Sequence, residues 1–330
     1  MPTSPGRVGV RSDQPGLGIL CILAGMTCIS INDMLIKQLS DNYPLHQMVF
    51  VRSVIGIGCN IIILQFEGGW SSMKTDQPVL HIIRGLAVVF ANMAFFAALA
   101  AMPLADATAL FFVAPLFITL LSIPLLGEQV GPRRIIAVVV GFAGVLIMMR
   151  PGQSTIEVPF WVTMLPIIAA FAYAFMQILT RKLGISARAS VLAIYLQSTF
   201  IVVSALFWLI AGDGRFVDQV DNPSLIFLLR AWQWPEAGDL WMFLALGINA
   251  GVIGYTLSQA YRLTNAATVA PFEYVALPLA IFWGWLIWQD WPSTQVWIGI
   301  GLIAGAGIYV FVRERIRARP VSSQRPVRRH

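Results

Sequence analysis

The sequence predicts an all-α integral membrane protein with ten transmembrane helices, arranged as two inverted repeats of five helices. Three observations predict it: the composition, ten separate apolar stretches, and an internal similarity between two segments. Of the 330 residues, 58% are hydrophobic and 12% are charged, and the mean hydropathy is +0.75. Average soluble domains contain about 25% charged residues, so this chain has too few polar side chains to cover a surface that faces water. Lipid is therefore the expected solvent.

Ten apolar stretches provide the predicted spans, because a helix that crosses a bilayer needs about 20 mainly apolar residues. The third and fourth are separated only by Met102-Pro103, which predicts a helical hairpin. The long connection 212–238 contains Trp232 and Trp234, which suits a place on the membrane surface. The stretches run approximately over 16–39, 46–66, 78–101, 104–126, 133–150, 159–182, 190–211, 239–262, 266–288 and 293–312.

The distribution of Lys and Arg predicts the orientation, because these residues are enriched in cytoplasmic loops. With the N-terminus in the cytoplasm, 16 of the 22 Lys and Arg fall inside and 3 fall in outer loops. Residues 1–15 are then a disordered cytoplasmic tail, and residues 315–330 are a basic cytoplasmic tail. A basic tail near anionic lipid explains the net charge of +6 better than a nucleic-acid partner, because no basic face with interleaved aromatic residues occurs elsewhere.

The few cysteines and histidines predict neither a disulfide framework nor a metal site. Cys21, Cys28 and Cys59 each lie in an apolar run without a CxxC motif, and the three histidines are scattered. No cofactor is expected.

Two segments of the chain resemble each other. The first is "PLADATALFFVAPLFITLLSIPLLGEQVGPRRIIAVVVGFAGVLIMMRPG" (103–152), and the second is "TNAATVAPFEYVALPLAIFWGWLIWQDWPSTQVWIGIGLIAGAGIYVFVRE" (264–314). Each has a helix with two prolines, an acidic turn and a glycine-rich helix that ends in arginine. The prolines are Pro115 and Pro124 in one segment and Pro271 and Pro278 in the other.

The similarity divides the chain into a first repeat over 16–152 and a second over 153–314, which carries the long outer loop 212–238. Because five spans is an odd number, the second repeat enters the membrane from the opposite side. Inverted repeats with helices broken at matching positions, here at Pro115, Pro271 and Pro278, are typical of alternating-access transporters.

These residues also carry a family resemblance, which covers residues 16 to 315. "PLADATALFFVAPLFITLLS", and "APFEY" followed by an acidic turn and "GIGLIAGAGIYVFVRE", resemble the EamA-domain family of the drug/metabolite transporter superfamily. The resemblance implies ten helices, cytoplasmic termini and a central cavity shared by both halves. The pairing of "PLADAT" with "PFEY" is similar to bacterial riboflavin and S-adenosylmethionine uptake carriers. The loop 212–238 departs from the compact family pattern.

Glu273 is the first candidate for a binding residue. It lies about seven residues, or roughly 10 Å, into the ninth span, where an ionisable group costs about 2.5–3.5 kcal/mol and usually faces the bundle interior or water. Pro271 and Pro278 flank it and free backbone carbonyls. Two interpretations stay open: Glu273 binds a cationic or hydrogen-bond-donating substrate group or a proton, or it pairs structurally with an arginine of another span.

The first span offers Asp33 and Lys37, which are four residues apart and so lie on one face. Lys37 is close to the interface and is expected to form a local ion pair. Asp33, with its neighbours Asn32 and Ser30, lies deeper and is a candidate for the cavity.

Three further charged residues are interpreted as structural. Arg52 in the second span and Arg84 in the third are either gate partners of a carboxylate or anchors for an anionic substrate group, and the gate or structural role is favoured. Asp106 begins the fourth span, where the helix dipole favours a carboxylate, so capping outweighs binding.

Uncharged polar and aromatic residues complete the candidates, because they can hydrogen-bond between helices or to substrate, or stack on a planar ligand. In the last span, Gly301 and Gly305 form a GxxxG motif that predicts close helix packing, either within the chain or in a dimer. The polar and aromatic candidates are Asn92, Gln177, Asn249, Gln259, Tyr173, Tyr255, Phe272 and Tyr274.

The sequence therefore predicts a secondary transporter of the bacterial inner membrane. Its substrate would be a small polar or planar metabolite, resembling riboflavin, S-adenosylmethionine or an amino acid, and protons are a candidate second partner. An exporter of the same fold is the alternative, and a homodimer stays open. An intramembrane enzyme or a channel is remote, because the sequence has no HExxH motif, no clustered histidines and no filter-like loop.

Overall fold

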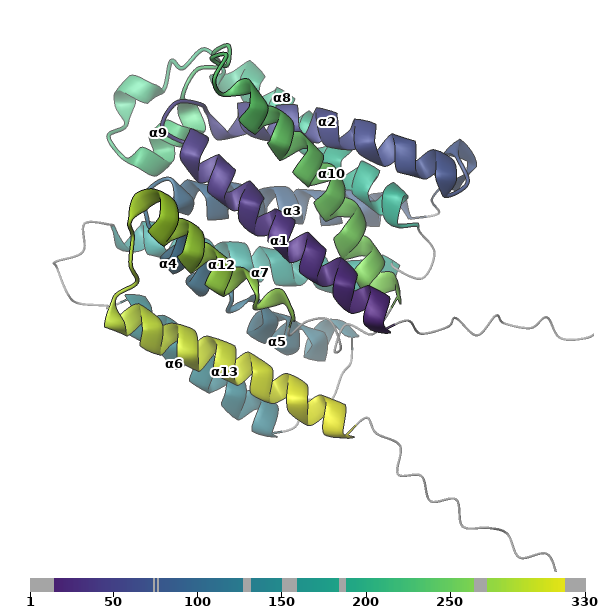
Figure 1. Cartoon of the computed structure of the whole chain (residues 1–330), viewed down its shortest axis with the longest axis vertical. Helices are drawn as coiled ribbons and strands as arrows, with labels where there is room; N and C mark the ends of the chain where they lie inside the picture. Colours follow the sequence, from purple (N-terminus) through teal and green to yellow (C-terminus); the bar gives the residue numbers. More distant parts are fainter. Residues whose placement is uncertain are drawn as a thin grey trace, which may run out of the picture.

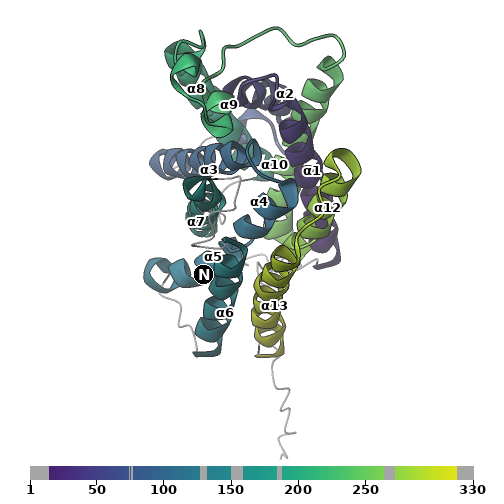
Figure 2. The same ribbon diagram turned by 90° about the vertical axis from the view of Figure 1, so that its left-hand side faces the viewer.

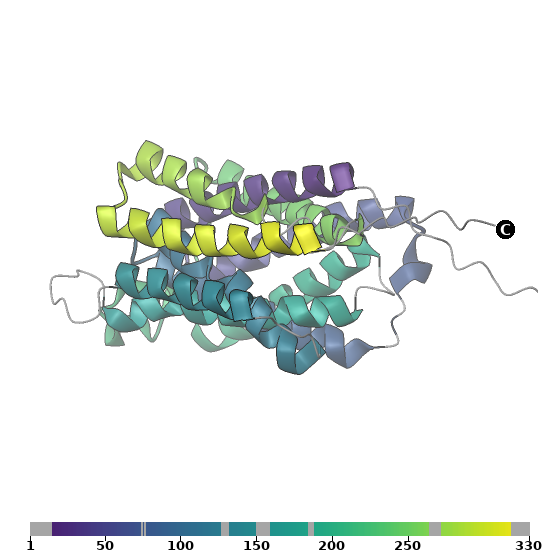
Figure 3. The ribbon, with the colours of Figure 1, turned by 90° about the horizontal axis from the view of Figure 1, so that it is seen from below.

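The computed structural model describes residues 15–73, 75, 77–126, 132–149, 159–183, 188–263 and 272–317. Every regular element in these ranges is a helix (Figure 1). Six helices are long and apolar enough to cross a membrane, and they run along a common direction (Figure 3). They are α1 (Pro15–Leu39), α2 (Leu45–Phe66), α3 (Pro78–Leu99), α7 (Phe160–Leu183), α8 (Ala189–Ala211) and α10 (Leu240–Leu263).

Shorter apolar helices occupy the other four predicted stretches. The tails 1–14 and 318–330, the acidic turn 127–131 and the segment 264–271 lie outside the described residues. The shorter helices are α4 (Leu104–Phe111), α5 (Ala114–Leu126), α6 (Pro132–Met149), α12 (Ala276–Trp283), which continues into the π-helical turn η3 (Gly284–Trp288), and α13 (Thr294–Arg317). A further short 3-10 turn, η1 (Trp70–Met73), follows α2.

Two predicted spans are interrupted. The fourth is interrupted between α4 and α5, just before Pro115. The ninth is interrupted at the turn that precedes α12, and Pro278 is the third residue of that helix. Pro115 and Pro278 thus both lie in the first turn of the helix that follows the break, where proline is tolerated because the N–H groups of a first turn have no intrahelical acceptor. Pro271 lies outside the described residues.

The helix pairings follow a pattern of exchange. The helix α1 packs on α10, and α3 packs on α7; α1 also contacts α12, and α4 contacts α7. If α1 is exchanged with α7, α3 with α10 and α4 with α12, the α1–α10 pair becomes the α3–α7 pair, and the α1–α12 contact becomes the α4–α7 contact. The pairs α2–α8, α4–α12 and α6–α13 map onto themselves, and α6 and α13 lie side by side at one edge (Figures 1 and 2). The start of α1 and the end of α13 lie toward the same end of the bundle (Figures 1 and 3).

Glycines set the closest helix contacts, although not at the predicted motif. A Cβ atom on Gly144 of α6 would lie 3.0 Å from the carbonyl oxygen of Gly299 in α13. By contrast, no heavy atom lies within 4 Å of a Cβ atom built on Gly301 or Gly305. The predicted close packing at Gly301 and Gly305 is therefore not made among the described residues. Gly305 lines an open hollow with Ile136 of α6, and packing of these glycines in a dimer stays a prediction.

The seam between α10 and α2 gives a testable prediction. A Cβ atom on Gly247 would lie 2.4 Å from the Cβ atom of Ile55, and neither atom can rotate away. We expect Gly247→Ala to lower the melting temperature of the purified protein, since overpacking costs roughly 1–3 kcal/mol. The matched control Gly301→Ala should leave it unchanged or raise it slightly, because alanine favours a helix. Equal melting temperatures in the two variants would contradict the tight seam.

Candidate functional site

A buried polar network surrounds Arg52 of α2, whose side chain is 6% exposed. Arg52 Nη1 donates to Asn32 Oδ1 at 3.1 Å, and Nη2 donates to Asn92 Oδ1 at 3.0 Å. Asn32 Nδ2 in turn donates to Asp33 Oδ1 at 3.2 Å, and Asn92 Nδ2 donates to the carbonyl oxygen of Val88 at 3.1 Å. The guanidinium is thus held by two neutral amides from α1 and α3, and Asn32 links it to the carboxylate of Asp33.

Aromatic rings cover the faces of the same guanidinium. The Arg52 Cζ atom lies 5.5 Å from the ring centroid of Phe96 and 5.3 Å from that of Phe200. Cations are attracted to ring faces at these distances. Because Phe96 belongs to α3 and Phe200 to α8, the Arg52 network joins both predicted halves of the chain.

A second cluster forms where α7 meets the start of α12. Gln177 Nε2 donates to Tyr173 Oη at 2.6 Å, one turn earlier on α7. Glu273 is 6% exposed, and its carboxylate interacts electrostatically with both Tyr173 and Tyr274. The Tyr274 hydroxyl lies against α13, where a Cβ atom on Gly307 would be 1.8 Å from it. Four of the predicted binding residues are therefore brought together here.

A run of aromatic contacts connects the two clusters. It passes from the Arg52 network on α3, through the end of α4, to α7. A second contact reaches the Glu273 cluster from the end of α4: the ring centroids of Phe112 and Tyr274 are 5.3 Å apart. The successive centroid distances are 5.4 Å for Phe96–Phe95, 5.2 Å for Phe95–Phe111 and 5.4 Å for Phe111–Tyr173.

Lys37 hydrogen-bonds to backbone carbonyl groups, and it interacts electrostatically with Asp290 and with the nearby Asp41. Its Nζ atom donates to the carbonyl oxygens of Leu99 at 3.1 Å and Met102 at 2.8 Å, and it lies 5.3 Å from the Trp288 ring centroid. A cation is favoured at the carboxyl end of a helix such as α3, where carbonyl groups lack intrahelical partners. Asp106, in the first turn of α4, interacts electrostatically with Lys37. Lys37 thus joins α1, α3, α4 and η3 at one end of the bundle.

Arg84 bonds to α7 and not to the Arg52 network. Its Nε atom donates to Thr180 Oγ1 at 2.9 Å, which joins α3 to α7, and its side chain is 6% exposed. It precedes Asn92 by eight residues, or about 12 Å of helix. This contact joins two helices, and the gate or structural role of Arg84 stays a prediction.

The sequence offered signals for two contacts that the residue-by-residue interpretation missed. Gln177 bonds to Tyr173, and Gln259 Nε2 bonds in the same way to Tyr255 Oη at 2.8 Å. Both are Tyr-x-x-x-Gln pairs, and residues four apart face each other on a helix. No comparable signal marks Phe200, because its contact with Arg52 joins residues distant in the chain.

Comparison with known proteins gives the family. The sequence model of the EamA-like transporter family matches residues 16–150. A riboflavin transporter of Rhizobium johnstonii is 30% identical over 251 residues, which cover 76% of each chain. This chain belongs to the EamA-like transporter family. The EamA-like protein is therefore a multi-pass membrane transporter and not an enzyme.

Other relatives cover more of this EamA-like transporter. An S-adenosylmethionine uptake transporter of Rickettsia prowazekii is 25% identical and covers 90% of this chain and 93% of its own. The pseudopaline exporter CntI of Pseudomonas aeruginosa is 28% identical and covers 88% and 94%. A solved crystal structure superposes with a TM-score of 0.63 at 20% identity, over 93% of this chain and 99% of its own, so it shares the fold.

Proposed function

We propose that this EamA-like protein is a secondary active transporter that moves a small polar or planar metabolite across the bacterial inner membrane by alternating access. The observation that carries the proposal is the pair of buried clusters, one around Arg52 and one around Glu273, joined by aromatic rings. Sites for small molecules combine apolar and aromatic walls with a few placed polar groups. A flat molecule with polar groups at both ends fits such a lining, and riboflavin and S-adenosylmethionine both contain a flat ring system.

Two inverted repeats of five spans, over 16–152 and 153–314, make up the proposed architecture. The exchange pattern of the helix pairings supports it, as does the family match to 16–150. The interruptions before Pro115 and before α12 fall at equivalent places in the two repeats. Cytoplasmic termini follow from the excess of Lys and Arg in the inner segments.

Each candidate residue has a proposed role. The clusters at Asp33 and Glu273 bind substrate or a proton, and the gate residues hold the bundle closed at its ends or along α3. If the gate contacts at one end of the bundle break while those at the other end form, the binding site opens to one side of the membrane at a time. The binding residues are Asn32, Asp33, Asn92, Tyr173, Gln177, Glu273 and Tyr274; the gate or ion-pair residues are Lys37, Arg52, Arg84 and Asp106.

Uptake is the proposed direction, since two of the relatives above are named for riboflavin transport and for S-adenosylmethionine uptake. Export is the second candidate, because the pseudopaline exporter is 28% identical over most of its length. Counterflow in proteoliposomes loaded with candidate substrates separates a carrier from a channel, because a saturable carrier exchanges substrate against substrate.

A panel of ligands tests the substrate class. Riboflavin, S-adenosylmethionine, aromatic and basic amino acids, and polyamines are added to the detergent-purified protein. We expect one class to raise the melting temperature, since a ligand that binds only the native state stabilises it by mass action. Glu273→Gln should weaken that shift by at least about tenfold in ligand concentration, because a hydrogen bond to a charged group is lost.

Glu236→Gln is the matched control, because Glu236 is exposed and distant in sequence from both clusters. It should respond to ligand as the unmodified protein does. A panel without any shift would reject the substrate class, and an unaltered shift in Glu273→Gln would remove Glu273 from the site.

A further inference from the structure

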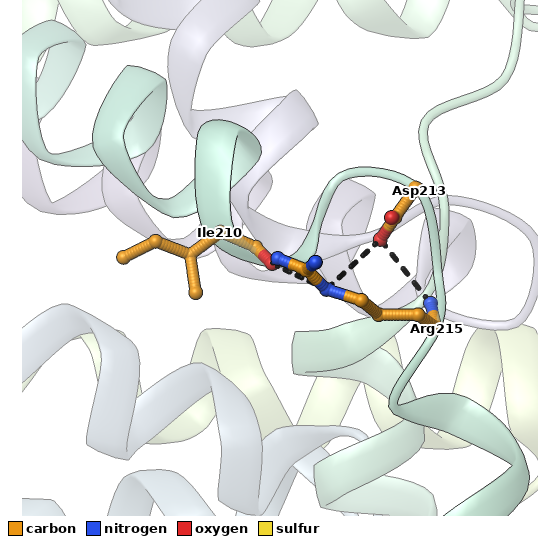
Figure 4. A network of polar contacts seen from close by, with 3 residues as sticks. All are labelled: Ile210, Asp213 and Arg215. Atoms are coloured by element: carbon orange, nitrogen blue, oxygen red, sulfur yellow. Dashed lines mark hydrogen bonds and ion pairs between the residues drawn. The ribbon is translucent and has the colours of Figure 1, made fainter.

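The connection between α8 and α10, residues 212–238, which we call the strap, is folded back onto the bundle. It contains the short elements η2 (Val217–Gln219) and α9 (Pro223–Leu229). Where it leaves α8, Arg215 Nε donates to the carbonyl oxygen of Ile210 at 3.1 Å and lies 3.7 Å from Asp213 Oδ1 (Figure 4). The two charged side chains are 56% and 62% exposed, so this ion pair is worth about 0–1 kcal/mol. The start of the strap is therefore weakly held.

The second part of the strap, which arches over α2 (Figure 2), is hydrogen-bonded to the turn between α1 and α2 and to the start of α2. Arg230 Nη1 donates to the carbonyl oxygen of Ser40 at 3.0 Å and also to that of Asp41. Gln233 exchanges two bonds with Gln47 of α2: Gln47 Nε2 donates to the Gln233 carbonyl oxygen at 2.6 Å, and Gln233 N donates to Gln47 Oε1 at 3.2 Å. These bonds lie at the surface end of the bundle, where water can replace them.

Tyr43, in the same turn, holds the end of the strap. Its hydroxyl donates to Asp239 Oδ2 at 2.7 Å and accepts from Glu236 N at 2.9 Å. Burial raises the pKa of the Tyr43 hydroxyl above its ordinary value, so it remains a donor. The turn between α1 and α2 and the first turn of α2 thus fix the strap at three successive points.

Beneath these bonds, aromatic rings pack the strap against α2 and α8. The Trp232 ring centroid lies 5.9 Å from that of His46, 5.4 Å from Phe50 and 5.7 Å from Trp208. His46 also packs on Phe207 at 5.2 Å. These aromatic rings cover the space between α2, α3 and α8.

A narrow hollow with room for about one water molecule lies beneath these rings. On one side it is bounded by Leu228 of α9, and on another by Asn92, which accepts a hydrogen bond from Arg52. Ser204 of α8 also lines it and is buried. The hollow therefore runs from the strap to the Arg52 network.

We propose that the strap is a lid over a passage to the Arg52 network, and that its release from the turn between α1 and α2 opens the hollow to solvent. The bonds at Arg230, Gln233 and Tyr43 are polar contacts of the strap to the turn between α1 and α2 and to the start of α2, whereas α10 is fixed to α2 by the tight contact at Gly247. The strap is thus the part of this end that can move without separating the long helices. The proposal rests on the proposed function only in naming the passage as a substrate route.

The accessibility of the hollow tests the lid without any substrate. A reporter, Ser204→Cys, is introduced after the natural cysteines Cys21, Cys28 and Cys59 are replaced by alanine. The protein is placed in nanodiscs, and the rate of labelling by a charged, water-soluble maleimide is measured. If labelling requires lid opening, its rate follows the population of the open form.

We expect Arg230→Ala to raise the labelling rate about tenfold, because it removes charge-assisted hydrogen bonds that only the closed lid makes. Arg215→Ala is the matched control: its exposed contacts stay at the end of α8, so the rate should not change. Tyr43→Phe is a milder second variant that removes only the hydroxyl bonds, and it should raise the rate by a smaller factor.

Ser258→Cys in α10 serves as a reporter outside the hollow. A rise at Ser258→Cys equal to that at Ser204→Cys would mean that Arg230→Ala loosens the whole bundle, and the lid would be rejected. Unchanged labelling of Ser204→Cys in both Arg230→Ala and Tyr43→Phe would reject it too. Because no substrate enters the experiment, its outcome is independent of the ligand panel.

Discussion

Arg52→Lys is expected to lower transport at least about tenfold and to lower the melting temperature of the purified protein. Lysine keeps the positive charge, but its single ammonium group cannot reproduce the planar fork that reaches Asn32 and Asn92 together. One of the two amide oxygens then stays buried without its donor, which costs roughly 1–3 kcal/mol. Uptake into proteoliposomes and thermal unfolding in detergent measure the two effects.

Arg215→Lys is the matched control, since Arg215 carries the same side chain at an exposed position of the strap. It should leave both quantities unchanged. If Arg52→Lys behaved like Arg215→Lys, the charge alone would account for Arg52, and the bidentate geometry would have no functional role. Arg52→Ala should be more harmful than Arg52→Lys, because Asp33 would also lose the nearby positive charge.

Asp33→Asn is expected to abolish substrate accumulation driven by a pH gradient while counterflow exchange persists. Asparagine is nearly the same shape and can still accept the hydrogen bond from Asn32, so the network is preserved. It cannot carry a proton, however, so net transport would lose its coupling. Relative to the unmodified protein, we expect substrate accumulation to fall at least about tenfold and counterflow to stay within about threefold, because the variant lacks the one carboxyl group that takes up and releases the proton.

Glu273→Gln distinguishes the two carboxylates. If Glu273 binds the substrate itself, its amide variant should lose counterflow as well as accumulation. Normal transport by both Asp33→Asn and Glu273→Gln would reject the assignment of substrate or proton binding to these residues.

The sequence predicted the helices well because each depends on a local property, the presence of a long run of mainly apolar residues. Mainly apolar residues over 46–66, 78–101 and 190–211 anticipate α2, α3 and α8 to within a few residues. The two described breaks lie just before Pro115 and Pro278, because a proline has no N–H group with which to continue the preceding helix. The total of ten spans and the placement of the termini remain predictions.

The partners of the candidate residues could not be predicted in the same way. Lys37 bonds to the carbonyl oxygens of Leu99 and Met102, and a backbone acceptor leaves no sequence signature. Arg52 and Asn32 were each recognised as unusual in a membrane span, but their pairing depends on the complete fold, because α1 and α2 pack on α10 rather than on each other. The docking of the strap joins Arg230 to a turn 190 residues earlier, so it depends on the complete fold.

The strap also has an unequal counterpart. Exchange of the predicted repeats maps the α8–α10 connection onto the connection between α2 and α3, which spans only residues 67–77 and carries the short turn η1. In a fully symmetric carrier the two access states would have equal free energies and be equally populated. Each bond that closes the strap shifts this balance toward the state sealed at its own end, and about 1.4 kcal/mol shifts it tenfold. The length of one connection would thus set the resting conformation, and with it the side of the membrane to which the site of the empty carrier is open.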